Sequence, residues 1–186
     1  SALESGFAYL LVAVVIILAA GASQALVTRF GVRLILSIGM VLLVLGLLWF
    51  TQIDVDGTYV VDLVPGFILA GVGLGFAFVP VSIAALEGVR AHEAGVASGL
   101  INTSQQIGGA LGIAILSTIA TSRTQDLIDD AAGAPEAIPG ALTEGFQYAF
   151  AVGAVMAVIG LIVTLVFLDR DVRPQEVAEP AGEPAG

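Results

Sequence analysis

The chain has 186 residues, of which 58% are hydrophobic and only 12% are charged, whereas about a quarter of the residues in an average soluble domain are charged. A water-soluble core cannot absorb that excess of apolar residues, so the composition excludes an ordinary soluble domain. The chain has no Lys and no Cys, and its 6 basic residues face 16 acidic ones, which argues against a nucleic-acid footprint, a disulfide framework and a thiolate metal site.

Five long apolar segments follow one another along the chain, at residues 7–27, 34–50, 63–86, 94–120 and 146–168. Each meets the requirement of about 17 to 25 mostly apolar residues for crossing a bilayer. None contains Asp, Glu, Arg, Lys or His, and a charge at a helix centre costs about 2.5 to 3.5 kcal/mol in lipid. Because lipid leaves every backbone amide to be satisfied internally, we predict an all-α membrane protein with five transmembrane helices.

The first segment follows an acidic start, so it lacks the basic region of a secretory signal. The chain also has no initiating Met, and we expect it to begin partway through a longer polypeptide. A short connection, residues 28–33, forces the first two helices into an antiparallel hairpin, and Gly31 permits a tight turn. Arg29 and Arg33 in this connection either anchor to anionic lipid headgroups or pair with helix ends or with acidic groups of another domain.

The third segment carries Gly71, Gly73 and Gly75, followed by Pro80. These glycines resemble the opening of a dinucleotide-binding fingerprint, but Phe76 occupies the third glycine position and no strand precedes them. Since Gly71 and Gly75 are one turn apart, they let a neighbouring backbone approach closely. Pro80 removes one helix hydrogen bond and predicts a kink. The segment is either a tight helix crossing or a flexible point that bends during transport.

The fourth segment carries a polar stripe. Ser98, Asn102 and Gln106 are spaced four apart and share one face, while Gln105 points about 100° away from Gln106. Polar groups in hydrocarbon face the bundle interior or a wet cavity, so the stripe either makes hydrogen bonds between helices or lines a substrate passage. Two pairs of glycines with small-xxx-small spacing, which predict close helix packing, are Gly95 with Gly99 and Gly108 with Gly112.

The arginines predict the orientation. Five of the six lie in connections on one side, which should be the cytoplasm; they are Arg29, Arg33, Arg90, Arg170 and Arg173. The opposite side receives residues 51–62 and a longer predicted loop, 121–145, with Trp49 and Phe50 at the outer end of the second segment. The acidic tail, 169–186, has almost nothing to bury, so we expect it to be disordered in the cytoplasm.

No motif indicates an enzyme, a metal or a cofactor. His92 and Glu93 are adjacent, but the zincin pattern needs a second His at position 96, which is Val96.

Two blocks of sequence, residues 66–86 and 95–119, resemble the C-terminal part of a major facilitator superfamily transporter, in the fourteen-span multidrug/proton antiporter branch. The connection TRFGVR, residues 28–33, is similar to the family's cytoplasmic signature, with Gln24 and Thr28 in place of its glycine and acidic residue. The resemblance implies that the five helices form most of the C-terminal half of the bundle. Such transporters bind substrate between two halves and alternate by rocking one against the other.

The resemblance also implies a function. We expect a proton-coupled exporter of hydrophobic or cationic drugs, multi-pass in the plasma (inner) membrane with a cytoplasmic C-terminus. Its partners would be the lipid bilayer, the missing N-terminal helices of the same polypeptide and a small hydrophobic substrate, with no nucleic acid. Because the five segments hold no titratable group, the coupling carboxylate would lie in helices outside this chain. The alternative is a non-transporting five-helix membrane scaffold or assembly protein.

Overall fold

A computed structural model describes residues 2–55, 57, 62–90 and 92–168. Within them lie five long helices, α1 (Ala2–Phe30), α2 (Val32–Phe50), α3 (Val64–Leu86), α4 (Ala94–Asp130) and α5 (Ile138–Phe167), with a short 3-10 helix, η2 (Pro135–Ala137), before α5. All five are long and apolar enough to cross a membrane, which confirms the predicted all-α membrane fold. The predicted acidic tail, 169–186, lies outside the described residues.

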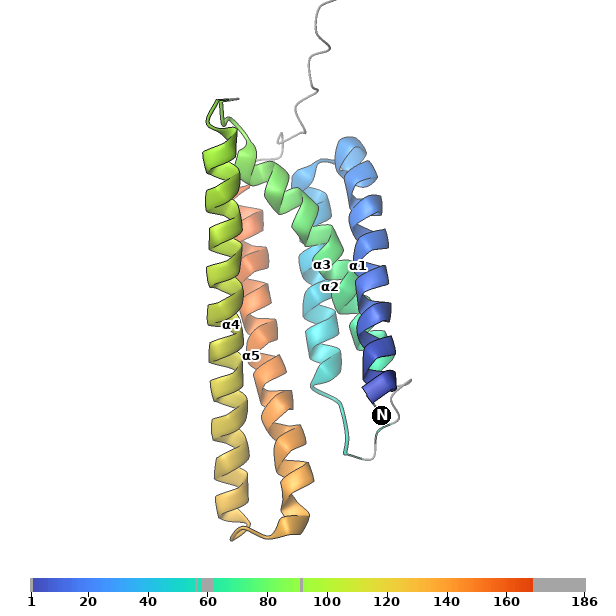
Figure 1. Cartoon of the computed structure of the whole chain (residues 1–186), viewed down its shortest axis with the longest axis vertical. Helices are drawn as coiled ribbons and strands as arrows, with labels where there is room; N and C mark the ends of the chain where they lie inside the picture. Colours follow the sequence, from blue (N-terminus) through green and yellow to red (C-terminus); the bar gives the residue numbers. More distant parts are fainter. Residues whose placement is uncertain (1, 56, 58–61, 91, 169–186) are drawn as a thin grey trace, which may run out of the picture.

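The helices alternate in direction, so α1, α3 and α5 run one way and α2 and α4 the other (Figure 1). α3 packs against both α1 and α2, while α5 packs against α2 and α4. The spatial order is therefore α1, α3, α2, α5, α4, with α4 at one edge of the bundle. One end of the bundle, called here the Gly31 end, carries the α1–α2 turn, the α3–α4 connection and the end of α5 (Figure 1).

The connection between α1 and α2 is shorter than predicted. Instead of the six residues 28–33, it is the single residue Gly31, because α1 continues to Phe30 and α2 begins at Val32. Gly31 has φ 85° and ψ 160°, a conformation that residues with a side chain rarely adopt. One glycine therefore reverses the chain, and the predicted hairpin is tighter than the sequence suggested.

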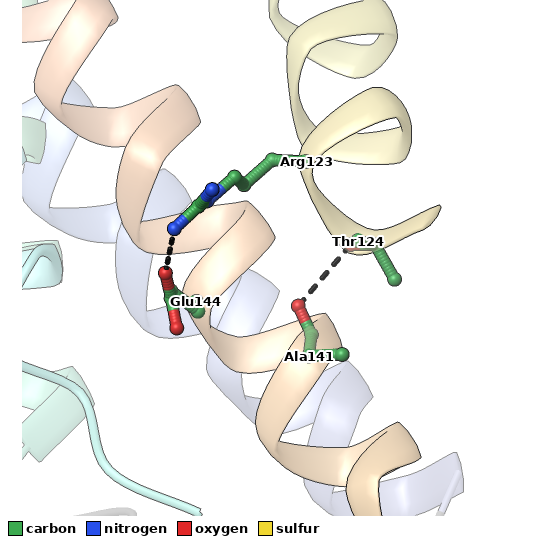
Figure 2. Close-up of polar contacts among 4 residues, drawn as sticks. All are labelled: Arg123, Thr124, Ala141 and Glu144. Atoms are coloured by element: carbon green, nitrogen blue, oxygen red, sulfur yellow. Dashed lines mark hydrogen bonds and ion pairs between the residues drawn. The ribbon is translucent and has the colours of Figure 1, made fainter. Parts of the chain in front are cut away.

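The predicted loop 121–145 was wrong, because most of it is helical. α4 continues to Asp130 and α5 begins at Ile138, so only residues 131–137 connect them. Side-chain contacts hold the extended part together (Figure 2): Arg123 Nη2 lies 2.5 Å from Glu144 Oε1, and Thr124 Oγ1 lies 3.3 Å from Ala141 O. A charged residue, Arg123, follows the end of the apolar segment in the sequence, but in the structure it pairs with Glu144 across a hairpin in which both helices are longer than predicted.

Glycines bring α2 and α3 into backbone contact. A Cβ atom added at Gly73 would lie 2.6 Å from the backbone nitrogen of Leu43 and 2.8 Å from the carbonyl oxygen of Gly39. Neither group belongs to a side chain that can rotate away. The absence of a side chain at Gly73 and Gly39 therefore sets the distance between these two helices, as expected where association depends on van der Waals packing.

The other side of α3 approaches α1 in the same way. A Cβ atom added at Gly75 would lie 2.6 Å from Ala19 Cβ and 2.9 Å from Ile16 O, and one at Gly71 would lie 3.0 Å from Val15 Cγ1. Gly71 and Gly75 thus meet the same neighbouring helix, as their spacing predicts, and Gly73 between them meets α2. α3 is the centre of a three-helix group held by close approach.

Replacing Gly73 with Ala should separate α2 from α3, because the new methyl group meets backbone atoms. We expect a loss of about 1–3 kcal/mol of stability, the usual cost of overpacking. The measurement is the temperature at which the detergent-extracted protein loses its monodisperse peak in size-exclusion chromatography. Gly21→Ala is the matched control, since nothing lies within 4 Å of a Cβ added there. Equal melting temperatures for both variants would contradict the proposed role of Gly73.

Candidate functional site

The polar stripe of α4 lies on the uncovered surface of the chain. α4 packs mainly against α5, and Ser98, Asn102, Gln105 and Gln106 are all exposed. The structure thus brings these four side chains together on one helix, but it covers none of them. In a bilayer this surface cannot face lipid without cost, because hydrocarbon offers a polar group no hydrogen-bond partner.

The hydroxyl groups of α4 differ from its amide groups. Thr103 Oγ1 donates to Gly99 O at 2.9 Å and Thr118 Oγ1 donates to Ala114 O at 2.8 Å, so these hydroxyls are satisfied within the helix. A side-chain amide has two donor hydrogens and an acceptor oxygen. In the described part of the chain, no residue pairs with the side-chain amides of Asn102, Gln105 or Gln106. These three amides therefore need hydrogen-bond partners from outside the described chain.

The glycines of α4 also lack close neighbours. A Cβ atom added at Gly95, Gly99, Gly108 or Gly112 would find nothing within 4 Å, in contrast to the close contacts at Gly73 and Gly75. The predicted packing against these glycines is absent from the described chain. It stays a prediction that requires a helix from outside the chain.

Arg33 contacts a helix end. Its Nη2 donates to the carbonyl oxygen of Leu165, in the last turn of α5, 132 residues away in sequence. The last carbonyls of a helix have no partner within it, so a guanidinium group at this position caps α5. Of the two interpretations of the loop arginines, Arg33 makes the helix-end contact, while Arg29 is exposed in the last turn of α1. Gly31 forms the turn between them.

A cavity of about 260 Å³ at the opposite end collects aromatic residues that the sequence did not link. Phe50 lies at its centre, with ring centroids 5.2 Å from Phe67 and 5.0 Å from Phe150. Gln147 Nε2 closes one side by donating to Ile53 O at 2.5 Å. The sequence placed Phe50 at an interface but gave no signal for Phe67, Gln147 or Phe150, because these residues come from two other helices, α3 and α5.

Two further sequence predictions concern Pro80 and His92. α3 continues through Pro80, which is buried, so a bend at this residue stays a prediction. His92 Nε2 lies 3.6 Å from Glu93 Oε1 and both side chains are exposed. Among the described residues no group of three or more His, Cys, Asp or Glu is arranged to hold a metal ion.

Comparison with known proteins adds independent information. The model of the Major Facilitator Superfamily matches residues 1–113, which include α1, α2, α3 and the polar stripe of α4. The puromycin resistance protein pur8 of Streptomyces alboniger is 33% identical over 116 residues, which cover 62% of this chain and 23% of that protein. The cephamycin export protein CmcT of Amycolatopsis lactamdurans is 34% identical over 92 residues, or 50% of this chain and 19% of that protein.

A third relative, the tetracenomycin C resistance and export protein of Streptomyces glaucescens, is 33% identical over 131 residues, covering 70% of this chain and 24% of that protein. The chain thus spans at most about a quarter of the length of these relatives. The family model covers more than half of the chain and takes in α1, α2, α3 and the first part of α4. The chain therefore belongs to the Major Facilitator Superfamily of membrane transporters.

Proposed function

We propose that this chain is the C-terminal part of a proton-coupled exporter of small hydrophobic or cationic compounds, and that the polar stripe of α4 lines the substrate pathway. The observation that carries this proposal is the exposure of Asn102, Gln105 and Gln106 on a surface of α4 that the rest of the described chain leaves uncovered. In lipid such a surface has to face either protein or water. A pathway between this chain and the rest of the transporter supplies both.

The chemistry of the stripe suits this class of substrate. Ser98, Asn102 and Gln106 are neutral and offer both donors and acceptors, so they can bind polar groups of a ligand without the cost of burying a fixed charge. The apolar residues of α4 beside them would hold the hydrophobic part of the compound. The names of the relatives refer to puromycin, cephamycin and tetracenomycin C, which supports an antibiotic-sized organic substrate.

Energy coupling requires a titratable group in the pathway. The apolar segments of this chain contain none. We therefore assign the proton-carrying carboxylate to the part of the transporter outside this chain, and alternating access to the movement of that part relative to these five helices. A non-transporting scaffold would instead keep the α4 stripe permanently covered by another helix.

The pathway role is tested by Asn102→Leu and Gln106→Leu in the whole transporter. Each substitution removes a hydrogen-bonding group worth about 0.5–1.5 kcal/mol, so the KM for export should rise about 2- to 10-fold per substitution. The measurement is efflux of a fluorescent hydrophobic cation from cells, with the amount of protein in the membrane determined in parallel.

Ser104→Leu is the control for this experiment. Ser104 is exposed on α4 and points about 200° away from Asn102. The substitution Ser104→Leu introduces a leucine on another face of α4, away from the stripe, so export should stay unchanged. The pathway role fails if Ser104→Leu impairs export as much as the stripe variants, or if the stripe variants export normally across a broad panel of compounds.

The orientation gives a separate prediction. Glu93, in the α3–α4 connection, and Asp130, at the end of α4, are both exposed and lie at opposite ends of the bundle (Figure 1). In a cysteine-free version of the whole transporter, a membrane-impermeant maleimide should label Asp130→Cys in intact cells. Glu93→Cys should react only after permeabilisation, because the arginine-rich Gly31 end should face the cytoplasm. The reverse pattern would invert the assigned topology.

A further inference from the structure

A second cavity opens at the Gly31 end of the bundle, beside the cap that Arg33 places on α5. Its volume is about 390 Å³, and its lining residues lie at the end of α1, in the first two turns of α2 and in the last turn of α5. They are Phe30, Arg33, Leu34, Ser37 and Leu165. The cavity is thus formed where two helices distant in sequence meet.

Among the described residues that line the cavity, Arg33 is the one ionisable group, and it gives this part of the lining a positive charge. Its bond to Leu165 O uses one of the five N–H donors of the guanidinium group and fixes the group in place. Ser37 Oγ donates to the backbone oxygen of Arg33 at 2.8 Å, which uses the hydroxyl hydrogen inside α2. The positive charge is therefore held rigidly at the cavity, with further donors on the same planar group.

The rest of the lining is apolar and open. Phe30, Leu34 and Leu165 have exposed fractions of 59%, 49% and 44%. Leu34 lies in the first turn of α2, where the apolar membrane segment begins, so the apolar surface runs from the positive group toward the hydrocarbon. This arrangement, with a fixed cation at the membrane boundary and an apolar flank beneath it, is complementary to a molecule with an anionic head and a hydrocarbon chain.

We propose that this cavity binds one anionic phospholipid, whose phosphate accepts hydrogen bonds from Arg33 and whose acyl chain lies along Leu34 and Leu165. A planar guanidinium group binds phosphate oxygens through two parallel N–H bonds. A free phosphate would leave the apolar flank unused, and a zwitterionic lipid would bring its own cation into a cavity that already holds one. The site is separate from the α4 stripe, so it does not depend on the proposed substrate pathway.

The test is native mass spectrometry of the whole transporter in detergent, titrated with palmitoyl-oleoyl phosphatidylglycerol, with the matched phosphatidylcholine, or with glycerol phosphate. Phosphatidylglycerol should bind tightest, and glycerol phosphate, which lacks the acyl chains, should not bind measurably. Arg33→Gln should weaken phosphatidylglycerol binding about tenfold or more, since it removes a charge-assisted hydrogen bond. Arg33→Lys keeps the charge and loses the planar fork, so its affinity for phosphatidylglycerol should lie between those of the unmodified protein and Arg33→Gln.

Two variants distinguish phosphatidylglycerol binding in the cavity from a general attraction of anionic lipid to positively charged residues. Arg29→Gln removes an arginine from the nearby last turn of α1, outside the cavity lining, so phosphatidylglycerol binding should stay within about twofold of the unmodified protein, the change expected of an exposed charge. Ser37→Leu fills the cavity while leaving Arg33 in place, so binding should fall as in Arg33→Gln.

This second variant keeps the test valid if loss of the α5 cap unfolds Arg33→Gln. The proposal is overturned if phosphatidylcholine binds as tightly as phosphatidylglycerol, or if Arg29→Gln weakens binding as much as Arg33→Gln. It is also overturned if Ser37→Leu binds normally, or if glycerol phosphate alone competes for the site.

Discussion

Lipid offers a protein no hydrogen-bond partner, and this constraint determines how the five helices are held together. Since hydrocarbon surrounds the helices on all sides, burying more apolar surface gives little advantage, and association depends on how closely the backbones approach. Gly73 against Gly39, and Gly75 against Ala19, provide that approach on the two sides of α3. The three-helix group of α1, α2 and α3 is therefore built on the absence of side chains rather than on large apolar residues.

The lack of hydrogen-bond partners in lipid also determines what α4 requires from its surroundings. The glycines at 95, 99, 108 and 112 have the spacing of those in α3, yet none meets another helix in the described chain, and the amides of Asn102 and Gln106 lie on the same uncovered helix. A helix with these residues is stable in a membrane only if further protein, or water enclosed by protein, covers it. The family match and the limited coverage of the relatives agree with a larger protein that does so.

The sequence correctly predicted the features that depend on local composition, and it failed for features that depend on contacts between residues distant in the chain. Five long apolar segments without charged residues were enough to identify the membrane helices. The spacing of Gly71 and Gly75 correctly placed both on one face of α3. The predicted end of α4 was wrong because the apolar segment stops just before Arg123, whereas the helix continues to Asp130 and Arg123 pairs with Glu144 on α5. Neither the aromatic cavity around Phe50 nor the contact from Arg33 to Leu165 has a signal in the sequence, since both join separate helices.

α5 is attached to the three-helix group by polar contacts toward both of its ends, and α4 lies beyond it at the edge of the bundle. At the Gly31 end Arg33 binds the carbonyl of Leu165, and toward the opposite end Gln147 donates to the carbonyl of Ile53. Between these two attachments α5 packs along α2, while α4 packs mainly against α5. Displacing α5 would require breaking polar contacts toward both of its ends. α4 packs on α5, which these contacts hold in place, and its polar stripe faces away from the other helices. In the pathway proposed above, the stripe of α4 would then be the wall whose position stays constant while the opposite wall changes.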